Sequence, residues 1–145
     1  MASADLKKSV ISKVPLFKGL KDRQVQRLAD RMTERTFAVG DVIVEQGHGG
    51  EGFYVLTEGS AEATRVRMDG EKIVVNSFGP TDFFGELALL DDTGVRTASI
   101  VATKPTTCLV LTRWDFIATL RLDADMAVYI LQELAKRFRV ALDSL

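Results

Sequence analysis

The chain has 145 residues, of which 46% are hydrophobic and 27% are charged, and its formal net charge is −1. These values describe one soluble domain of common size and leave no room for a two-domain enzyme. A chain of this length buries roughly two-thirds of its unfolded surface, so its core needs no disulfide or metal. We expect a cytoplasmic protein without membrane contact, because no apolar stretch approaches the roughly 18 residues of a span and residues 1–8 do not form a signal peptide.

One histidine and one cysteine restrict the chemistry further. Metal hydrolases, zinc fingers and Ser-His-Asp enzymes draw on histidine repeatedly, so we expect no catalytic site, no metal and no cofactor. His48 lies in a glycine-rich segment that predicts a solvated turn. Cys108 lies in an apolar run, where a cysteine is usually a small buried hydrophobe.

Charge is unevenly distributed along the chain. Residues 1–35 carry nine Lys/Arg and four Asp/Glu, whereas residues 36–120 carry six and twelve, a net charge of −6. Nucleic-acid affinity comes largely from Lys and Arg that neutralise phosphates. An acidic middle therefore makes DNA or RNA an unsuitable main ligand, and any anion must be bound by a few local groups.

Apolar residues at helical spacing predict two helices at the N-terminus. A short first helix, ended by Pro15, carries its apolar residues at Leu6, Val10, Ile11 and Val14. The segment from Leu16 to Phe37 predicts a second, amphipathic helix. Its apolar face contains Val25, Leu28, Ala29 and Met32.

The pattern changes after Phe37 to short runs rich in valine, isoleucine, phenylalanine and threonine, which predict strands. These runs are Asp41 to Glu45, Gly52 to Thr57, Ala61 to Val66, Lys72 to Phe78, Ala98 to Ala102 and Thr107 to Leu111. Turn residues separate them, and Asp69-Gly70 is the clearest hairpin turn. Short strands at close spacing without helices between them predict a mainly β fold, an antiparallel jelly-roll barrel.

Helical spacing returns after Arg113. One helix is predicted around Trp114 to Leu120, and the acids at Asp123 and Asp125 indicate the start of another. An apolar stripe follows on that last helix, at Ala127, Leu131, Leu134, Phe138, Leu142 and Leu145. We expect this stripe to pack on the barrel or on a second copy of the chain.

The segment Phe83 to Ser99 is the one that carries chemistry. Gly85 opens a helix-like stretch, Glu86 to Leu90, where glycine permits close backbone approach and free N–H groups accommodate an anion. Arg96 would supply a guanidinium that matches phosphate oxygens. A carboxylate beside a phosphate is repulsive unless it accepts from a hydroxyl, as an acid does at a ribose 2′-OH.

A simpler interpretation of the same residues stays open. Glu86 and Arg96 would then form a surface salt bridge, and the leucines of the helix-like stretch would only close the barrel. Those leucines are Leu87, Leu89 and Leu90.

The runs Phe84-Gly85-Glu86-Leu87-Ala88-Leu89-Leu90 and Arg96-Thr97-Ala98-Ser99 resemble the phosphate-binding cassette of cyclic nucleotide-binding domains. Such domains occur in protein kinase regulatory subunits, cyclic nucleotide-gated channels and bacterial catabolite activator proteins. The resemblance covers nearly the whole chain. It includes Pro15-Leu16-Phe17-Lys18-Gly19-Leu20, Gly40-Asp41, Gln46-Gly47, Phe53-Tyr54-Val55-Leu56 and Glu58-Gly59.

The resemblance implies roles for the cassette. Arg96 would pair with an oxygen of the cyclic phosphate, and Glu86 would accept from the ribose 2′-hydroxyl. The N–H groups of Gly85, Leu87 and Ala88 would complete the cradle. Further ligand contacts are expected at Phe84, Thr97, Ala98 and Val75.

Recognition of the base is less determined. Thr97 would bond a phosphate oxygen or the amino group of guanine, which favours cGMP or dual binding. Catabolite activators use hydroxyls on their last helix to contact adenine. The matching positions here are Ala141 and Leu142, which have no hydroxyl, so polar recognition of adenine of that kind is not expected. Channel-type domains use a basic residue there, for which Arg137 is the candidate and Arg139 the fallback; a solvated helix arginine is the alternative.

The sequence therefore predicts a cAMP or cGMP sensor that is not an enzyme. It would be one domain over residues 1–145: a helical N-terminus (5–36), a barrel (37–112) with the cassette (84–99), and C-terminal helices (113–145) that cover the ligand. The partner would be an output domain or effector outside this chain, with a homodimer through the C-terminal helix as a further expectation. A ligand-independent interaction module and a metal-dependent cupin enzyme are the alternatives.

Overall fold

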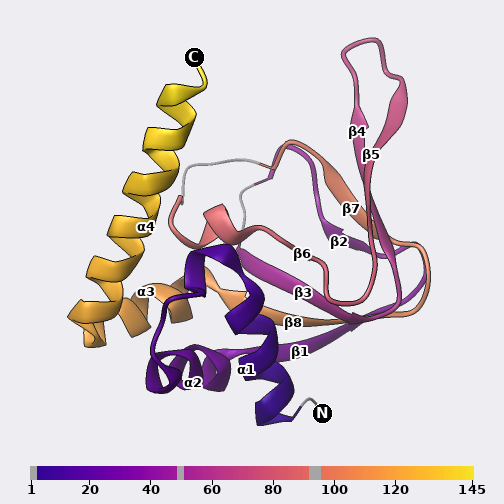
Figure 1. Ribbon diagram of the computed structural model, residues 1–145. Helices are drawn as coiled ribbons and strands as arrows, with labels where there is room; N and C mark the ends of the chain where they lie inside the picture. Colours follow the sequence, from indigo (N-terminus) through magenta and orange to yellow (C-terminus); the bar gives the residue numbers. More distant parts are fainter. Residues whose placement is uncertain (1–2, 49–50, 92–95) are drawn as a thin grey trace. The chain divides into compact units, whose positions relative to one another are not determined.

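The computed structural model describes residues 3–48, 51–91 and 96–145. It divides into two compact units, which we call the helical unit (Met1–Arg31 and Asp115–Leu145) and the barrel unit (Met32–Trp114). Figure 1 labels the elements of both units.

The helical unit contains α1 (Ala4–Lys13), the 3₁₀ turn η1 (Pro15–Phe17), α2 (Asp22–Arg31), most of α3 (Arg113–Leu122) and α4 (Ala124–Asp143). Ser3 caps α1 by accepting from the Leu6 N–H at 3.1 Å. Val14, which precedes Pro15, is extended and ends that helix. The buried side chains of Phe17 and Phe116 lie with their ring centroids 5.7 Å apart at the centre of this unit.

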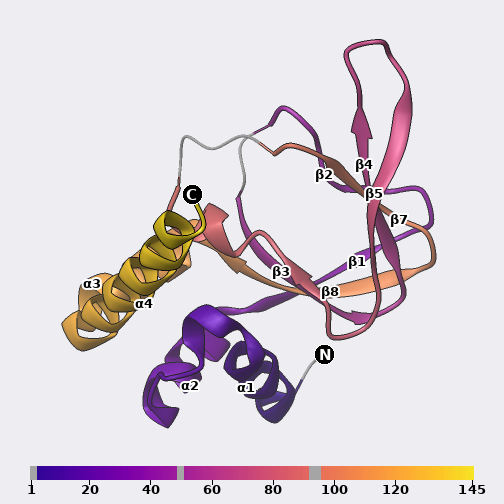
Figure 2. The same cartoon turned by 45° about the horizontal axis from the view of Figure 1, so that its top comes forward.

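The barrel unit consists of two four-stranded antiparallel sheets. The first has the order β1 (Thr33–Phe37), β8 (Thr106–Thr112), β3 (Gly52–Glu58) and β6 (Phe83–Phe84). The second has the order β2 (Val42–Val44), β7 (Ser99–Ala102), β4 (Ala61–Val66) and β5 (Lys72–Phe78). The β4–β5 hairpin extends beyond its sheet in both views of the ribbon (Figures 1 and 2). The predicted mainly β, jelly-roll fold is confirmed.

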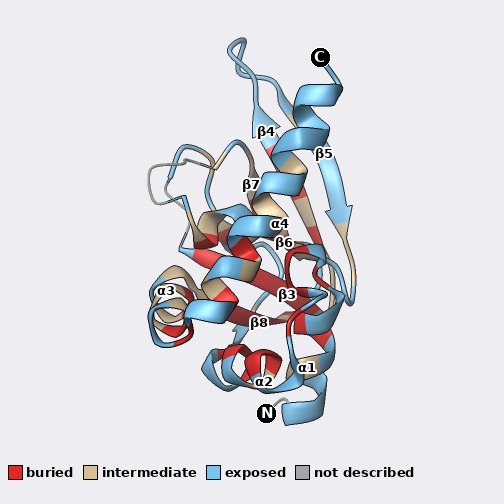
Figure 3. Ribbon diagram, turned by 60° about the vertical axis from the view of Figure 1, so that its left-hand side comes forward, coloured by how far each residue is buried: buried red, intermediate tan, exposed pale blue. Residues whose placement is uncertain are grey.

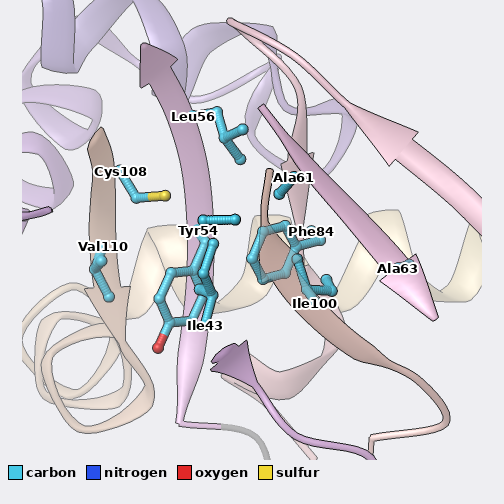
Figure 4. Packing of buried hydrophobic residues seen from close by; sticks show 10 residues of the cluster. Ile43, Tyr54, Leu56, Ala61, Ala63, Phe84, Ile100, Cys108 and Val110 are labelled. Carbon is cyan, nitrogen blue, oxygen red and sulfur yellow. The ribbon is translucent and has the colours of Figure 1, made fainter. Parts of the chain in front are cut away.

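Side chains from both sheets meet in one apolar cluster inside the barrel unit. Its largest members are Tyr54, Leu56 and Phe84 from the first sheet and Ile43 and Ile100 from the second. Alternation along the strands directs these residues inward, and Figure 4 shows them facing one another. The cassette thus begins at a residue, Phe84, that is anchored in the core.

One predicted element is wrong. The helix expected from Leu16 to Phe37 is shorter at both ends: the 3₁₀ turn η1 occupies its start, and α2 begins at Asp22 and ends at Arg31. Thr33–Phe37 instead forms the edge strand β1, paired with β8 from Thr33↔Val110 to Phe37↔Thr106. The two threonines and the phenylalanine of this segment favour a strand, and pairing with a buried strand decides the outcome.

The apolar stripe on the last helix is largely exposed. Leu131, Phe138, Leu142 and Leu145 are 50–101% exposed, whereas the residues that α4 buries are Met126 and Ile130. From Phe138 to its end α4 is exposed throughout, which Figure 3 shows in pale blue. The stripe is therefore not part of the core of this chain.

The predictions of an exposed His48 and a buried Cys108 are confirmed. His48 is exposed and lies 3.7 Å from Glu45, while Cys108 is fully buried and its burial raises the pKa of the thiol to about 11. No helix among the described residues combines the length and apolar character needed to cross a membrane.

Candidate functional site

The site lies where β6 ends and the chain turns at Gly85. Phe84 pairs with Tyr54 across β6 and β3, and their rings stack with centroids 5.0 Å apart and an interplanar angle of 7°. Figure 4 shows the two rings side by side in the cluster. This stack fixes the residue immediately before the cassette turn.

Gly85 adopts a left-handed conformation, with φ 86°. A Cβ at this position would lie 2.5 Å from the Gly52 carbonyl oxygen and 2.8 Å from Nη1 of Arg96. Both the backbone conformation and the space therefore require glycine. The sequence predicted close backbone approach here, and the approaching groups are the arginine and the backbone of β3.

Arg96 is the cation of this site. Its Nη2 donates to the Gly52 carbonyl oxygen at 3.0 Å, and its Nε is buried without a hydrogen-bond partner among the described residues. Burial lowers the pKa of the guanidinium, although an arginine remains charged at neutral pH. A half-buried cation that keeps an unused, buried N–H donor is suited to an anionic ligand.

Glu86 begins η2 (Glu86–Leu89), a single 3₁₀ turn of four residues. Its side chain is half-buried, and the Oε2 atom is buried completely. The expectation of a helix-like stretch through Leu90 is thus shortened by one residue. Because both Glu86 and Arg96 are half-buried, a bridge between them would not be the surface salt bridge of the simpler interpretation.

The remaining cassette positions behave differently from one another. Ala88 donates its N–H to the Gly85 carbonyl at 3.0 Å, which closes η2, so this N–H is engaged within the turn. Leu89 is fully buried, whereas Leu87 is 59% exposed. Only one of the leucines expected to close the barrel is therefore buried completely.

Three further expected contact residues belong to the barrel unit, and two of them, Thr97 and Ala98, lie within the cassette. Ala98 packs against the core cluster, and Thr97 is exposed. Val75 is 43% exposed and occupies the irregularity in β5, between Val74, which pairs with Thr64, and Asn76, which pairs with Ala63. Their contacts with a ligand stay predictions.

Arg137 lies on α4, in the helical unit. Its side chain is half-buried. The structure does not place it with the cassette residues, so its role toward the base also stays a prediction.

Sequence reasoning missed several groups that surround Arg96. The Gly52 carbonyl, 44 residues away in the sequence, accepts a hydrogen bond from Arg96 Nη2. Tyr54 stacks on Phe84, the residue before the cassette turn. Burial raises the pKa of Tyr54, and Arg96 opposes part of that effect. The glycine at position 52 in an otherwise strand-like run was the one available sequence indication.

The described residues contain no group of three or more His, Cys, Asp or Glu that could hold a metal ion. The geometry instead offers a glycine turn, a half-buried cation and a half-buried carboxylate. A family model described as the cyclic nucleotide-binding domain matches residues 34–123, which include this whole arrangement. The chain belongs to the cyclic nucleotide-binding domain family.

Relatives and solved structures agree with this family. The cyclic AMP receptor protein of Thermus thermophilus is 34% identical over 127 residues, which are 88% of this chain and 58% of that protein. The N-terminal domain of a transcriptional regulator from Streptomyces coelicolor A3(2) is 34% identical, with a TM-score of 0.84 and coverage of 93% of this chain and 94% of that chain.

A third neighbour is the regulatory domain of Toxoplasma gondii PKA, solved with cAMP. It is 27% identical, with a TM-score of 0.70, and the match covers 92% of this chain and 50% of that chain. This cyclic nucleotide-binding domain thus spans little more than half the length of the Thermus protein and half the length of the Toxoplasma chain.

Proposed function

We propose that this domain is a cyclic nucleotide sensor in which Arg96 neutralises the cyclic phosphate and Glu86 accepts from the ribose 2′-hydroxyl. The observation that carries the proposal is the close approach of Gly85 to the guanidinium of Arg96, whose buried Nε has no hydrogen-bond partner among the described residues. A phosphate at this turn would engage that donor and replace the neutral Gly52 carbonyl as the partner of Nη2.

The ligand would be cAMP or cGMP, and the domain would act as a regulator that catalyses no reaction. The Thermus and Toxoplasma proteins are described as a cyclic AMP receptor and as a PKA regulatory domain with cAMP, which supports cAMP. Thr97 supports cGMP, because an exposed hydroxyl beside the phosphate site can bond the guanine amino group. Direct comparison of the two nucleotides decides between them.

Ligand capture would be transmitted through the C-terminal helices to an output domain or effector protein. α4 is a long amphipathic helix with a capped N-terminus and few buried residues. Moving it would therefore cost little free energy. A ligand that binds one position of α4 better than another shifts the population toward it. We place this signalling in the cytoplasm.

Homodimerisation through α4 is part of the same proposal. Six exposed apolar residues of α4 and the C-terminus lie at alternating spacings of three and four, the heptad pattern of a coiled-coil seam. The seam consists of Val128, Leu131, Ala135, Phe138, Leu142 and Leu145. A second copy would cover this face.

The experiment that tests the site compares Arg96→Ala with the unaltered chain in nucleotide binding. Loss of a charge-assisted contact is expected to cost on the order of 2–4 kcal/mol, or about 30- to 900-fold in Kd. Arg67→Ala removes the same charge from an exposed residue of the β4–β5 hairpin and is expected to leave Kd within about twofold. Equal affinities of Arg96→Ala and the unaltered chain would refute the assignment of Arg96.

A further inference from the structure

The backbone of Arg96 is held by the loop that precedes β3. The Gly47 N–H donates to the Arg96 carbonyl oxygen at 2.8 Å, and the Arg96 N–H donates to the His48 carbonyl oxygen, also at 2.8 Å. These two bonds pair the segments in the manner of a short ladder. The backbone position of Arg96 therefore follows the position of this loop.

The same loop is attached to the end of β4 by the side chain of Gln46. Its Oε1 accepts from the Val66 N–H at 2.9 Å, and its Nε2 donates to the Val66 carbonyl oxygen at 3.3 Å. The side-chain amide thus makes the pair of bonds that a neighbouring strand would make. In addition, the Gln46 N–H donates to Ser99 Oγ at 2.8 Å, at the start of β7.

A second attachment starts from the adjacent residue of β4. Arg65 Nε donates to the Thr97 carbonyl oxygen at 3.1 Å, across 32 residues of sequence. Two side chains therefore connect the end of β4 with the segment that carries Arg96. Arg65 contacts Thr97 directly, whereas Gln46 contacts Val66 and is linked to Arg96 through the backbone of Gly47. A guanidinium that donates two hydrogen bonds to a phosphate must be correctly oriented toward it. Small displacements of the segment that carries Arg96 are therefore expected to weaken binding.

We propose that Gln46 and Arg65 are positioning residues for Arg96. They fasten residues 96 and 97 to the hairpin at the end of β4, and the hairpin thereby sets the orientation of the guanidinium. The inference rests on the proposed function, because its consequence is measured as affinity for a cyclic phosphate.

The first arm of the test measures Kd for cAMP and cGMP by calorimetry in Gln46→Met and Arg65→Met. Each change removes the side-chain hydrogen bonds described above and is expected to raise Kd about three- to tenfold. Arg67→Met is the matched control, since it removes the same charge from the same hairpin and is expected to bind like the unaltered chain. Unchanged Kd values in both Gln46→Met and Arg65→Met, or an equal loss in Arg67→Met, would overturn the proposal.

The second arm separates positioning from a general loss of structure. A double-mutant cycle combines Gln46→Met with Arg96→Lys, which keeps the charge but lacks the fork of donors. If Gln46 acts through the guanidinium, its loss costs less than about twofold in the Arg96→Lys background. The same cost in both backgrounds would overturn the positioning role.

The third arm needs no ligand. Amide hydrogen exchange of Gly47 and Arg96, measured by NMR in the unliganded protein, is expected to accelerate at least about threefold in Gln46→Met. Unchanged exchange would overturn the proposal. If the unaltered chain binds neither nucleotide, the proposed function fails, and the exchange rates alone decide whether these contacts hold Arg96.

Discussion

At position 85 the backbone and its neighbours leave no room for a side chain. The left-handed φ disfavours any L side chain, and a Cβ would clash with the Gly52 carbonyl and the Arg96 guanidinium. Glycine is therefore needed for two separate reasons, one local to the residue and one imposed by β3. The sequence predicted close backbone approach at Gly85, but it did not show that the approaching groups are the backbone of β3 and the Arg96 guanidinium.

Gly85→Ala is expected to weaken nucleotide binding at least about tenfold and to lower the free energy of unfolding by roughly 1–3 kcal/mol, from backbone strain and displacement of the arginine. Gly70→Ala is the matched control, because Gly70 has the same φ of 86° and no atom within 4 Å of the position that a Cβ would occupy. Urea unfolding and calorimetry measure both effects. Equal effects of the two changes on stability and binding would contradict the crowding at Gly85.

The sequence predicted which residues of the cassette carry its chemistry but not the groups that orient Arg96. Gly85, Glu86 and Arg96 were candidates because a glycine before a helix start and a nearby guanidinium suit an anion, and because their order resembles the phosphate-binding cassette. The partners of Arg96, by contrast, come from residues 44 or more positions away or from the backbone. A carbonyl oxygen has no residue-type signature, so local patterns do not reveal it.

At the scale of elements, alternation and turn residues predicted β3, β4 and β5 to within about one residue of their observed bounds. These strands carry strong β propensity and are flanked by glycine turns. β1 was assigned to a helix because it directly follows the amphipathic pattern of α2. Its pairing with β8, more than 65 positions away, decides its structure, and such non-local pairing lies outside a sequence window.

The start of α4 was predicted from its acids, and the structure shows how Asp123 works. Its Oδ1 accepts from the Met126 N–H at 3.1 Å, while Oδ2 lies 3.3 Å from Arg27 Nη1 and 3.5 Å from Gln24 Nε2. The N-cap hydrogen bond is the main cause that lowers the pKa of this carboxyl below its ordinary value of 3.8. The charged form is therefore the one that stabilises the helical unit.

Asp123→Ala is expected to lower the free energy of unfolding by about 1–2 kcal/mol at neutral pH. Because the folded-state pKa is lowered, this contribution is fully present above the unfolded pKa and disappears as the pH falls through the folded one. The difference between the two proteins in urea unfolding should be constant from about pH 5 to 8 and shrink below about pH 4. Asp125→Ala, in the same first turn, should cost less; a difference that persists undiminished to low pH would contradict this role of Asp123.

At the scale of the whole molecule, the fold class followed from the spacing of strands and turns, but the burial of the last helix did not. A sequence pattern shows which face of a helix is apolar, yet it does not show what covers that face. The seam on α4 is exposed in this chain, from 50% at Leu142 to 101% at Leu145. An exposed apolar stripe of this length is typical of an interaction surface.

Sedimentation measurements are expected to show a species of about twice the chain mass of 16.0 kDa at micromolar concentration. A chain that carries Leu131→Glu and Phe138→Glu should sediment as a monomer, because charges in a coiled-coil seam remain unpaired and desolvated. Gln132→Glu, on an exposed position between the seam residues, should stay dimeric. A monomeric unaltered chain would contradict the proposed use of α4.

The near-neutral total charge of the molecule conceals a barrel region that is acidic, and the account requires this region to bind an anion through one arginine and a few backbone amides. Calorimetric titration of the unaltered chain with cAMP and with cGMP tests that requirement most directly. The account predicts saturable binding of at least one of them at one site per chain, with an affinity that depends on Arg96. No heat with either nucleotide, at concentrations far above micromolar, would contradict it and would favour a ligand-independent interaction module on the same fold.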